Sequence, residues 1–229
     1  MNSKKSNLFI VRSLLATGLA CGTGQVIAYE ADDIILRAGV ASVQPDESSS
    51  ALKLDGAALA GTGVGVDHSE ALGLTATYML SSKVGIGLLA ATPFDHDLKA
   101  NGLAGGIDAG SSKQLPPTLT LQYFPNDSAA AFQPYVGIGV NYTLFFSEDV
   151  DSELEAVLGK GDLKIDDSIG LAAQAGFDYA VDDHWLLNAS IWYIDIDTDA
   201  EFKFDSGSRV KADVDIDPWV YMVGVGYKF

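Results

Sequence analysis

Six aspartates near the C-terminus have the residue type and spacing of an ion-binding site. They occupy alternate positions of two segments that would face each other across a hairpin, with Asp195, Asp197 and Asp199 opposite Asp217, Asp215 and Asp213. Facing like charges cost stability unless a cation lies between them. The first segment begins like a calcium-binding loop, but Ala200 replaces the required glycine and Ser206 the final glutamate. A bound divalent cation is one interpretation, and an acidic rim balanced by Lys203, Arg209 and Lys211 is the other.

Residues that could support catalysis are scattered along the chain. His68 and His96 fall in long connections that we expect on one side of the molecule, whereas His184 falls in a short turn on the other. A Ser-His-acid site would therefore have to join opposite ends. The glycine-rich run at 61–65 lacks the Lys-Ser/Thr that follows a phosphate-binding loop. We expect no catalytic residue, no cofactor and no enzymatic activity.

Composition limits the class of protein. The 229 residues include 14 Lys+Arg against 31 Asp+Glu, and this net charge of −17 excludes a nucleic-acid binder. A hydrophobic fraction of 48% excludes a disordered acidic chain. One cysteine excludes a disulfide framework and a cysteine-ligated metal. The chain is a folded acidic protein without a disulfide scaffold.

The first 28 residues have the pattern of a secretory signal peptide. Lys4, Lys5 and Arg12 precede or interrupt an apolar stretch over 8–20, and small residues lead to Ala28. The expected organisation is a signal peptide over 1–28, cleaved after Ala28, and one domain over 29–229. Cys21 then lies in the removed part, and lipidation at Cys21 is the alternative.

The rest of the chain alternates between apolar and small or polar residues with period two. Such runs predict strands with one apolar face. They cover 34–40, 72–78, 84–90, 115–123, 136–144, 169–177, 185–193 and 219–229. No segment of 29–229 has the 18 consecutive apolar residues of a transmembrane helix. Eight runs are an even number, as bacterial outer-membrane barrels have.

The connections alternate between short and long. The short ones are 81–83, 125–131 and 181–184, and the long ones, which we expect as outer loops, are 44–70, 95–114, 147–166 and 197–211. Short periplasmic turns and long outer loops are typical of an outer-membrane barrel. The fold class is therefore predicted as all-β, an eight-stranded antiparallel transmembrane β-barrel. Tyr221, Tyr227 and the terminal Phe229 resemble the signal that the barrel assembly machinery recognises.

Segments spread over the chain resemble the OmpW family of outer-membrane proteins. They are Leu89-Ala90-Ala91-Thr92-Pro93-Phe94, Leu115-Pro116-Pro117-Thr118-Leu119, Pro134-Tyr135-Val136-Gly137, Ile191-Trp192-Tyr193-Ile194 and Asp217-Pro218-Trp219-Val220-Tyr221. The resemblance implies a monomeric barrel with a narrow apolar channel for small hydrophobic molecules. It also implies that Leu89 and Trp192 narrow the lumen. The alternative for Trp192 is that its ring only fills space.

Two features of the predicted lumen bear on transport. Ile194, Val220 and Met222 join Leu89 and Trp192 in an apolar lining, while Arg37, Asp178 and Lys228 are the few inward charges, so we expect no charged plug. Pro93 and the pair Pro116-Pro117 lie at one height on neighbouring strands, and proline cannot donate to a strand ladder. One hypothesis is a lateral opening in the wall, which the resemblance supports; the other is that the prolines only end the strand pairing.

The sequence therefore predicts an outer-membrane channel of a Gram-negative bacterium for passive uptake of small hydrophobic or weakly polar molecules. Its expected partners are these solutes, outer-membrane lipids, lipopolysaccharide and the barrel assembly machinery. A cation bound at the aspartates could bridge to the phosphates of lipopolysaccharide. The alternative is a surface-interaction barrel with a closed lumen, whose acidic outer loops bind partners. An outer-membrane enzyme acting on acyl chains is the one enzymatic class left open.

Overall fold

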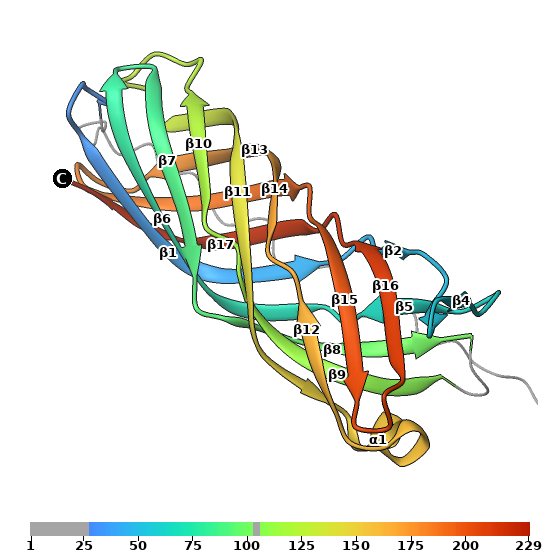
Figure 1. Ribbon diagram of the computed structural model, residues 1–229. Coiled ribbons are helices and arrows are strands. Elements are labelled where there is room, and N and C mark those ends of the chain that lie inside the picture. The colour runs from blue at the N-terminus through green and yellow to red at the C-terminus, as the bar shows by residue number, and fades with distance from the viewer. Residues whose placement is uncertain (1–27, 103–105) are drawn as a thin grey trace, which may run out of the picture.

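A closed eight-stranded antiparallel barrel forms one half of the molecule in the computed structural model, which describes residues 28–102 and 106–229 (Figure 1). Neighbouring strands pair around the full circle, and the last strand closes onto the first. In circular order they are β1(Ile34–Gln44), β6(Ser69–Ser81), β7(Val84–Ala91), β10(Thr118–Tyr123), β11(Phe132–Val150), β13(Ser168–Ala180), β14(Trp185–Ile194) and β17(Trp219–Lys228). The predicted fold class is confirmed. Closure leaves no unpaired strand edge in the bilayer.

The apolar face of each strand points outwards. Leu72, Ile138, Ile169 and Val223 are each at least half exposed, although no soluble protein would leave so many apolar side chains in water. Aromatic side chains cluster at both ends of this surface, with Trp185 and Phe229 near the periplasmic turns and Trp219 near the opposite rim. An apolar band between aromatic girdles is the outer surface of a transmembrane barrel. No helix among the described residues is long and apolar enough to cross a membrane.

The four long connections, expected as outer loops, consist largely of further β-strands. They continue the barrel as two sheets that face each other across an apolar core, which we call the outer sandwich (Figure 1). One sheet contains β5(Gly63–Val66), β8(Phe94–Asn101) and β9(Ile107–Leu115), which pairs with the outer part of β11; the other contains β2(Ser48–Ser49), β3(Lys53–Leu54), β4(Ala57–Ala58), β12(Gly161–Ile165), β15(Asp197–Phe204) and β16(Arg209–Asp215). The helix α1(Ser152–Leu158) lies at the far end.

The outer sandwich forms because its segments also alternate. Phe202, Phe204, Val210 and Val214 point inwards on one sheet while their neighbours are charged, and Leu98 does so on the other. One buried cluster extends from these residues into the outer half of the barrel, and a smaller cluster of Tyr29, Ile35, Met79, Phe124, Tyr135 and Leu186 fills the periplasmic end. Because charged residues occupy the positions between the apolar ones, these segments resemble loops in the sequence although they form strands.

Candidate functional site

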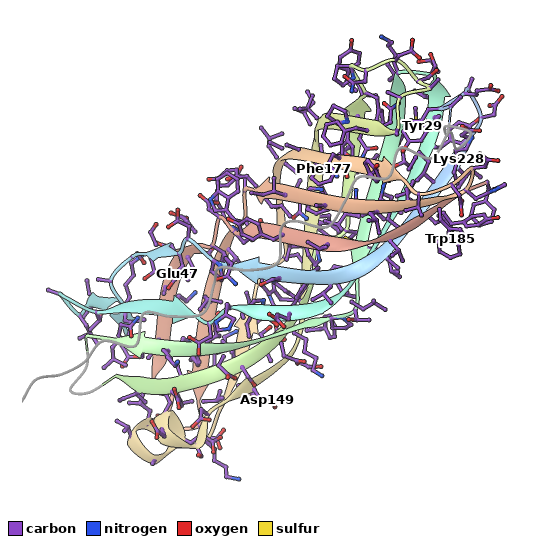
Figure 2. All side chains as sticks on the ribbon, turned by 180° about the vertical axis from the view of Figure 1, so that it is seen from behind. Tyr29, Glu47, Asp149, Phe177, Trp185 and Lys228 are labelled. Carbon is purple, nitrogen blue, oxygen red and sulfur yellow. The ribbon has the colours of Figure 1, made fainter. Side chains whose placement is uncertain are left out.

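A buried ion pair closes the periplasmic half of the lumen. Arg37 on β1 donates to both carboxylate oxygens of Asp178 on β13, with Nε to Oδ1 at 2.8 Å, and its Nη1 donates to Thr77 Oγ1 at 2.8 Å. Tyr29, which lies at the barrel mouth in Figure 2, and Asn188 each donate to Asp178 at 2.8 Å. Each of the five side chains belongs to a residue no more than 2% exposed. Burial of an ion pair is tolerated only when its remaining donors and acceptors are paired in this way.

A ladder of amides extends this network across the barrel. Thr77 donates to Gln122 Oε1 at 3.0 Å, and Gln122 Nε2 donates to Gln174 Oε1 at 2.9 Å. The Arg37 guanidinium also lies 5.4 Å from the ring centre of Tyr135. The expectation that the lumen lacks a charged plug is therefore wrong in its periplasmic half. Amides and hydroxyls from three further strands, β6, β10 and β14, surround the ion pair and fill the lumen beside it.

Apolar side chains line part of the outer half of the lumen, where Thr118, Asn141 and Thr143 are also buried in a hydrogen-bonded chain. Leu89, Trp192, Ile194, Val220 and Met222 all point inwards, are at most 5% exposed, and belong to the cluster that continues into the outer sandwich. Trp192 lies in register between Gln174 and Val220, directly beside the amide ladder. Its indole N–H has no acceptor among the described residues, which is unusual for a buried donor. The lining is thus in place, and the role of Leu89 and Trp192 as a constriction stays a prediction.

The barrel wall loses its pairing at the prolines. Pairing of β7 with β10 ends at Leu89 and Thr118, and pairing of β8 with β9 starts at Phe94 and Gln114. The intervening residues, 90–93 and 115–117, do not pair with each other. Each side stays anchored elsewhere: the Thr92 amide donates to Leu72 on β6 at 2.9 Å and the Tyr142 amide to Pro117 at 3.0 Å. The predicted break at Pro93 and Pro116-Pro117 is present, and passage of a solute through it stays a hypothesis.

Two apolar cavities lie in the outer sandwich. The larger, of about 180 Å³, lies beneath α1 and is lined mainly by leucine, alanine, valine and isoleucine side chains. The smaller, of about 30 Å³, lies deeper, beside His96, Gln114, Phe145 and Ile216. Val64, Leu98 and Ala200 line both cavities and separate them. Two separate apolar cavities therefore lie between the far end of the molecule and Gln114, the first paired residue above the break in the wall.

His96 borders the smaller cavity and is itself buried. Its Nδ1 lies 2.7 Å from the carbonyl oxygen of Asp67, so it donates there, and its Nε2 lies 2.9 Å from Gln114 Nε2 and accepts from it. Burial lowers the pKa of His96 below its ordinary value, despite the nearby carboxylates of Asp67, Asp95 and Asp97. The neutral ring keeps this part of the path uncharged. His184 lies at the opposite end, stacked on Tyr227, as the sequence predicted.

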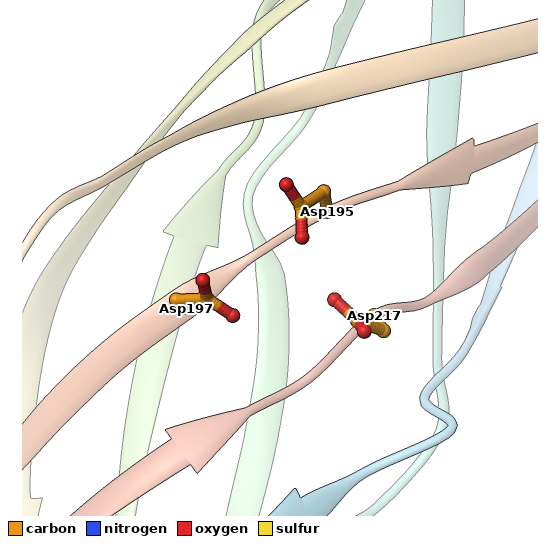
Figure 3. A group of neighbouring side chains, drawn as sticks. All are labelled: Asp195, Asp197 and Asp217. Carbon is orange, nitrogen blue, oxygen red and sulfur yellow. The ribbon is translucent and has the colours of Figure 1, made fainter.

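Four of the six aspartates pair in the predicted register. Asp197 pairs with Asp215, and Asp199 pairs with Asp213. Asp195, Asp197 and Asp217 have carboxylate oxygens within 4.8 Å of one another, and Figure 3 shows them around a common space at the barrel rim. Desolvation and the neighbouring carboxylates raise the pKa of Asp197. Cation binding here stays a prediction, because exposed acidic groups of this kind are common without an ion.

The expected compensating cations contact a different acid. Lys203, Arg209 and Lys211 surround Glu201, at 3.2, 3.4 and 3.3 Å. Lys53 from β3 instead lies 3.1 Å from Asp213 and lowers its pKa. A hydrogen bond between the two carboxyl groups is the main reason why the pKa of Asp199 is raised. Lys211 also acts to lower the pKa of Asp199, so the balance of the aspartates by these cations stays an interpretation beside cation binding.

The C-terminal aromatics lie on the outer surface of the last strand. Tyr221 and Phe229 are 46% and 65% exposed, and Phe229 packs edge-on against Tyr227, with ring centres 4.7 Å apart. This placement suits recognition by an assembly machinery, which stays a prediction. Several residues of the lumen and outer sandwich were not anticipated: Tyr29, Gln122, Gln174 and Asn188 in the plug, and Ala100 and Ala109 in the larger cavity. Only the polar alternation of the strands signals the plug residues.

Barrel, lipid-facing surface, aromatic girdles and one-sided outer sandwich together define the class of this protein, a bacterial outer-membrane β-barrel. The model of the OmpW family matches residues 30–229. Outer membrane protein W of Vibrio cholerae is 43% identical over 217 residues, covering 94% of this chain and 97% of that protein. The chain belongs to the OmpW family, and its location is the outer membrane.

Solved structures agree with this assignment. The crystal structure of OprG from Pseudomonas aeruginosa is similar with a TM-score of 0.84 and 50% identity, over 88% of this chain and 98% of that one. The solution structure of outer membrane protein W from E. coli has a TM-score of 0.57 and 40% identity, over 88% and 100% of the two chains. The relatives are outer-membrane proteins, and nothing in their descriptions refers to catalysis.

Proposed function

We propose that this protein is a monomeric channel for passive uptake of small hydrophobic or weakly polar molecules, with lateral release into the outer membrane. The observation that carries the proposal is the division of the interior. Apolar cavities lead inwards as far as the break in the wall, and a buried polar network fills the lumen below it. An apolar solute gains free energy by leaving water for an apolar environment and loses it on entering a polar one.

The path that this division supports has three steps. A solute enters the outer sandwich, passes the small cavity beside His96 and Gln114, and leaves between Pro93 and Pro116-Pro117. Phe94, which pairs with Gln114 and is 1% exposed, borders the exit. Leu89 and Trp192 form the floor of this path and keep the solute from the plug. The orphan N–H of Trp192 can donate to a carbonyl or ether oxygen, which extends the class to weakly polar molecules.

The test compares entry of a small apolar solute into liposomes that contain the barrel with entry into empty liposomes. Pro93→Ala supplies a backbone N–H that can restore pairing across the break, so uptake should be about fivefold slower, the factor that one hydrogen bond of ~1 kcal/mol represents. Trp192→Ala removes the floor and should change the rate as well. Pro125→Ala and Trp185→Ala, in a periplasmic turn and on the outer surface, are the matched controls.

The buried polar network in the lumen is also compatible with the alternative function, a surface-interaction barrel. If the rate equals that of empty liposomes, the channel proposal fails, and the molecule is a surface-interaction barrel that binds partners through its acidic outer segments. If uptake depends on the protein but Pro93→Ala has no effect, the lateral exit fails while the channel stands. The two outcomes separate the parts of the proposal.

A further inference from the structure

The cavity beneath α1 has the size and lining of a ligand site. Its volume is about 180 Å³, and the residues around it are apolar except for Lys99. Lys99 does not place a charge inside, since its Nζ pairs with Asp67 at 2.6 Å on the outer face of β8. Buried apolar cavities of roughly 150 Å³ stay dry and bind benzene. The cavity therefore offers an apolar space about as large as one aromatic ring.

The cavity exists because small side chains meet at one level of the outer sandwich. Ala100 and Ala109 on one sheet face Ala200 on the other, and all three are at most 5% exposed. Larger residues, among them Leu52, Leu98 and Phe202, surround them and keep the sheets apart. Close-packed interiors leave few voids of this size. A void held open by three alanines is a defined feature of this fold.

The helix α1 covers the outer end of the cavity and gives access to it. Asp151 caps the helix by accepting from the Glu153 amide at 2.8 Å, and Leu154 points into the cavity at 6% exposure. Val157 also lines the cavity but is 66% exposed, so the cavity reaches the surface at this turn. A molecule arriving from water meets an apolar side chain at the entrance.

We propose that this cavity is a binding site for one compact, uncharged hydrocarbon, with monocyclic aromatics as the chemical class. Ala100, Ala109 and Ala200 form its walls, and α1 covers it. The lining offers no side-chain hydrogen-bond partner to a polar substituent, so amino acids and sugars are excluded by the cost of burying their polar groups. This inference rests on the proposed function, because it names the molecules that the path would take in.

The test follows the alanine methyl signals of the protein in lipid nanodiscs during titration with benzene. We expect saturable shifts at Ala100, Ala109 and Ala200, and only the weak linear shift of lipid partitioning at Ala173, which faces the bilayer. Ala109→Phe fills the cavity and should weaken binding at least about tenfold, a difference of 1.4 kcal/mol. Ala173→Leu is the matched control and should bind as the native chain does.

Linear, equal shifts at all four alanines would overturn the proposal. If Ala109→Phe does not fold, Ala200→Leu fills the same space from the other sheet and gives the second reading. Liposome uptake separates the two proposals. Saturable binding without protein-dependent entry would leave the site and remove the channel, whereas entry without saturable binding would leave the channel and remove the site.

Discussion

At the scale of single residues, His96 shows how burial adjusts a common side chain to an apolar path. Asp67 and Gln114 hold its ring, which fixes the protonated nitrogen as Nδ1. A charged ring would also donate from Nε2, so Gln114 would have to turn its amide oxygen towards the ring, and a cation would lie beside the smaller cavity. Burial therefore lowers the pKa of His96 and favours the neutral form.

This arrangement predicts an acid-sensitive outer sandwich. Because the pKa of His96 is lowered on folding, its contribution to stability is complete above the ordinary histidine pKa of 6.5 and is lost as the pH falls below it. Local opening should rise by up to about tenfold per pH unit in that window. Limited proteolysis between pH 7 and pH 5 measures it. His96→Leu should remove the dependence, whereas His184→Leu should keep it; a pH step that survives in His96→Leu would refute the assignment.

At the scale of elements, the hairpin β15–β16 carries a charge conflict that its register imposes. Asp199 and Asp213 face each other, and Lys53 neutralises only Asp213. The pKa of Asp199 is raised, chiefly by its hydrogen bond to Asp213, so the folded hairpin favours the protonated form. Its contribution to stability is present at acid pH and is lost as the pH rises through the raised pKa of Asp199.

Asp199→Asn should stabilise the hairpin at neutral pH. The amide donates to Asp213 permanently and removes one of two facing charges, which is worth roughly 0.5 kcal/mol for a cross-strand pair. Hydrogen exchange of the β15 and β16 amides at pH 7 measures the gain, which should vanish at acid pH. Asp205→Asn removes the same charge from the turn of the hairpin and is the control. Equal protection in the two variants would argue against the conflict.

At the scale of the whole molecule, the Arg37–Asp178 pair joins opposite strands and separates two compartments. It ties β1 to β13 inside the closed barrel, and Tyr29 brings the start of the described chain into the same network. On its periplasmic side lies the smaller apolar cluster, and on its outer side the amide ladder separates it from the apolar cluster that continues into the outer sandwich. The pair and its network thus fill the lumen between the two apolar clusters.

Breaking the pair on one side should destabilise the barrel strongly. Asp178→Leu leaves Arg37 buried without its anion and should cost about 3–5 kcal/mol, while the double variant Arg37→Met with Asp178→Leu should recover much of that loss. Urea unfolding in lipid vesicles, followed by tryptophan fluorescence, measures both. A double variant that loses as much as the sum of its single substitutions would show that the pair carries no coupling energy.

Much of the fold was predictable from the sequence, because alternation needs only local information. Strand faces follow from period two, and a bilayer accepts strands only in a closed barrel, so Leu72, Ile138 and Val223 had to face lipid. The break in the wall was predictable for the same reason. Proline removes a donor wherever it stands, and the spacing of Pro93 and Pro116 placed both at one height.

Only the tertiary structure decided what lies inside. Arg37 and Asp178, and Lys53 and Asp213, are far apart in the chain, and no local pattern states which ions meet. The outer segments were read as loops because their charged positions mask the inward apolar ones; they become strands by pairing with partners that the barrel brings near. The cavities, too, are determined only by the tertiary structure. Ala100, Ala109 and Ala200 leave a void only because two sheets are held apart by larger neighbours, and the spacing between sheets is set by all of them together.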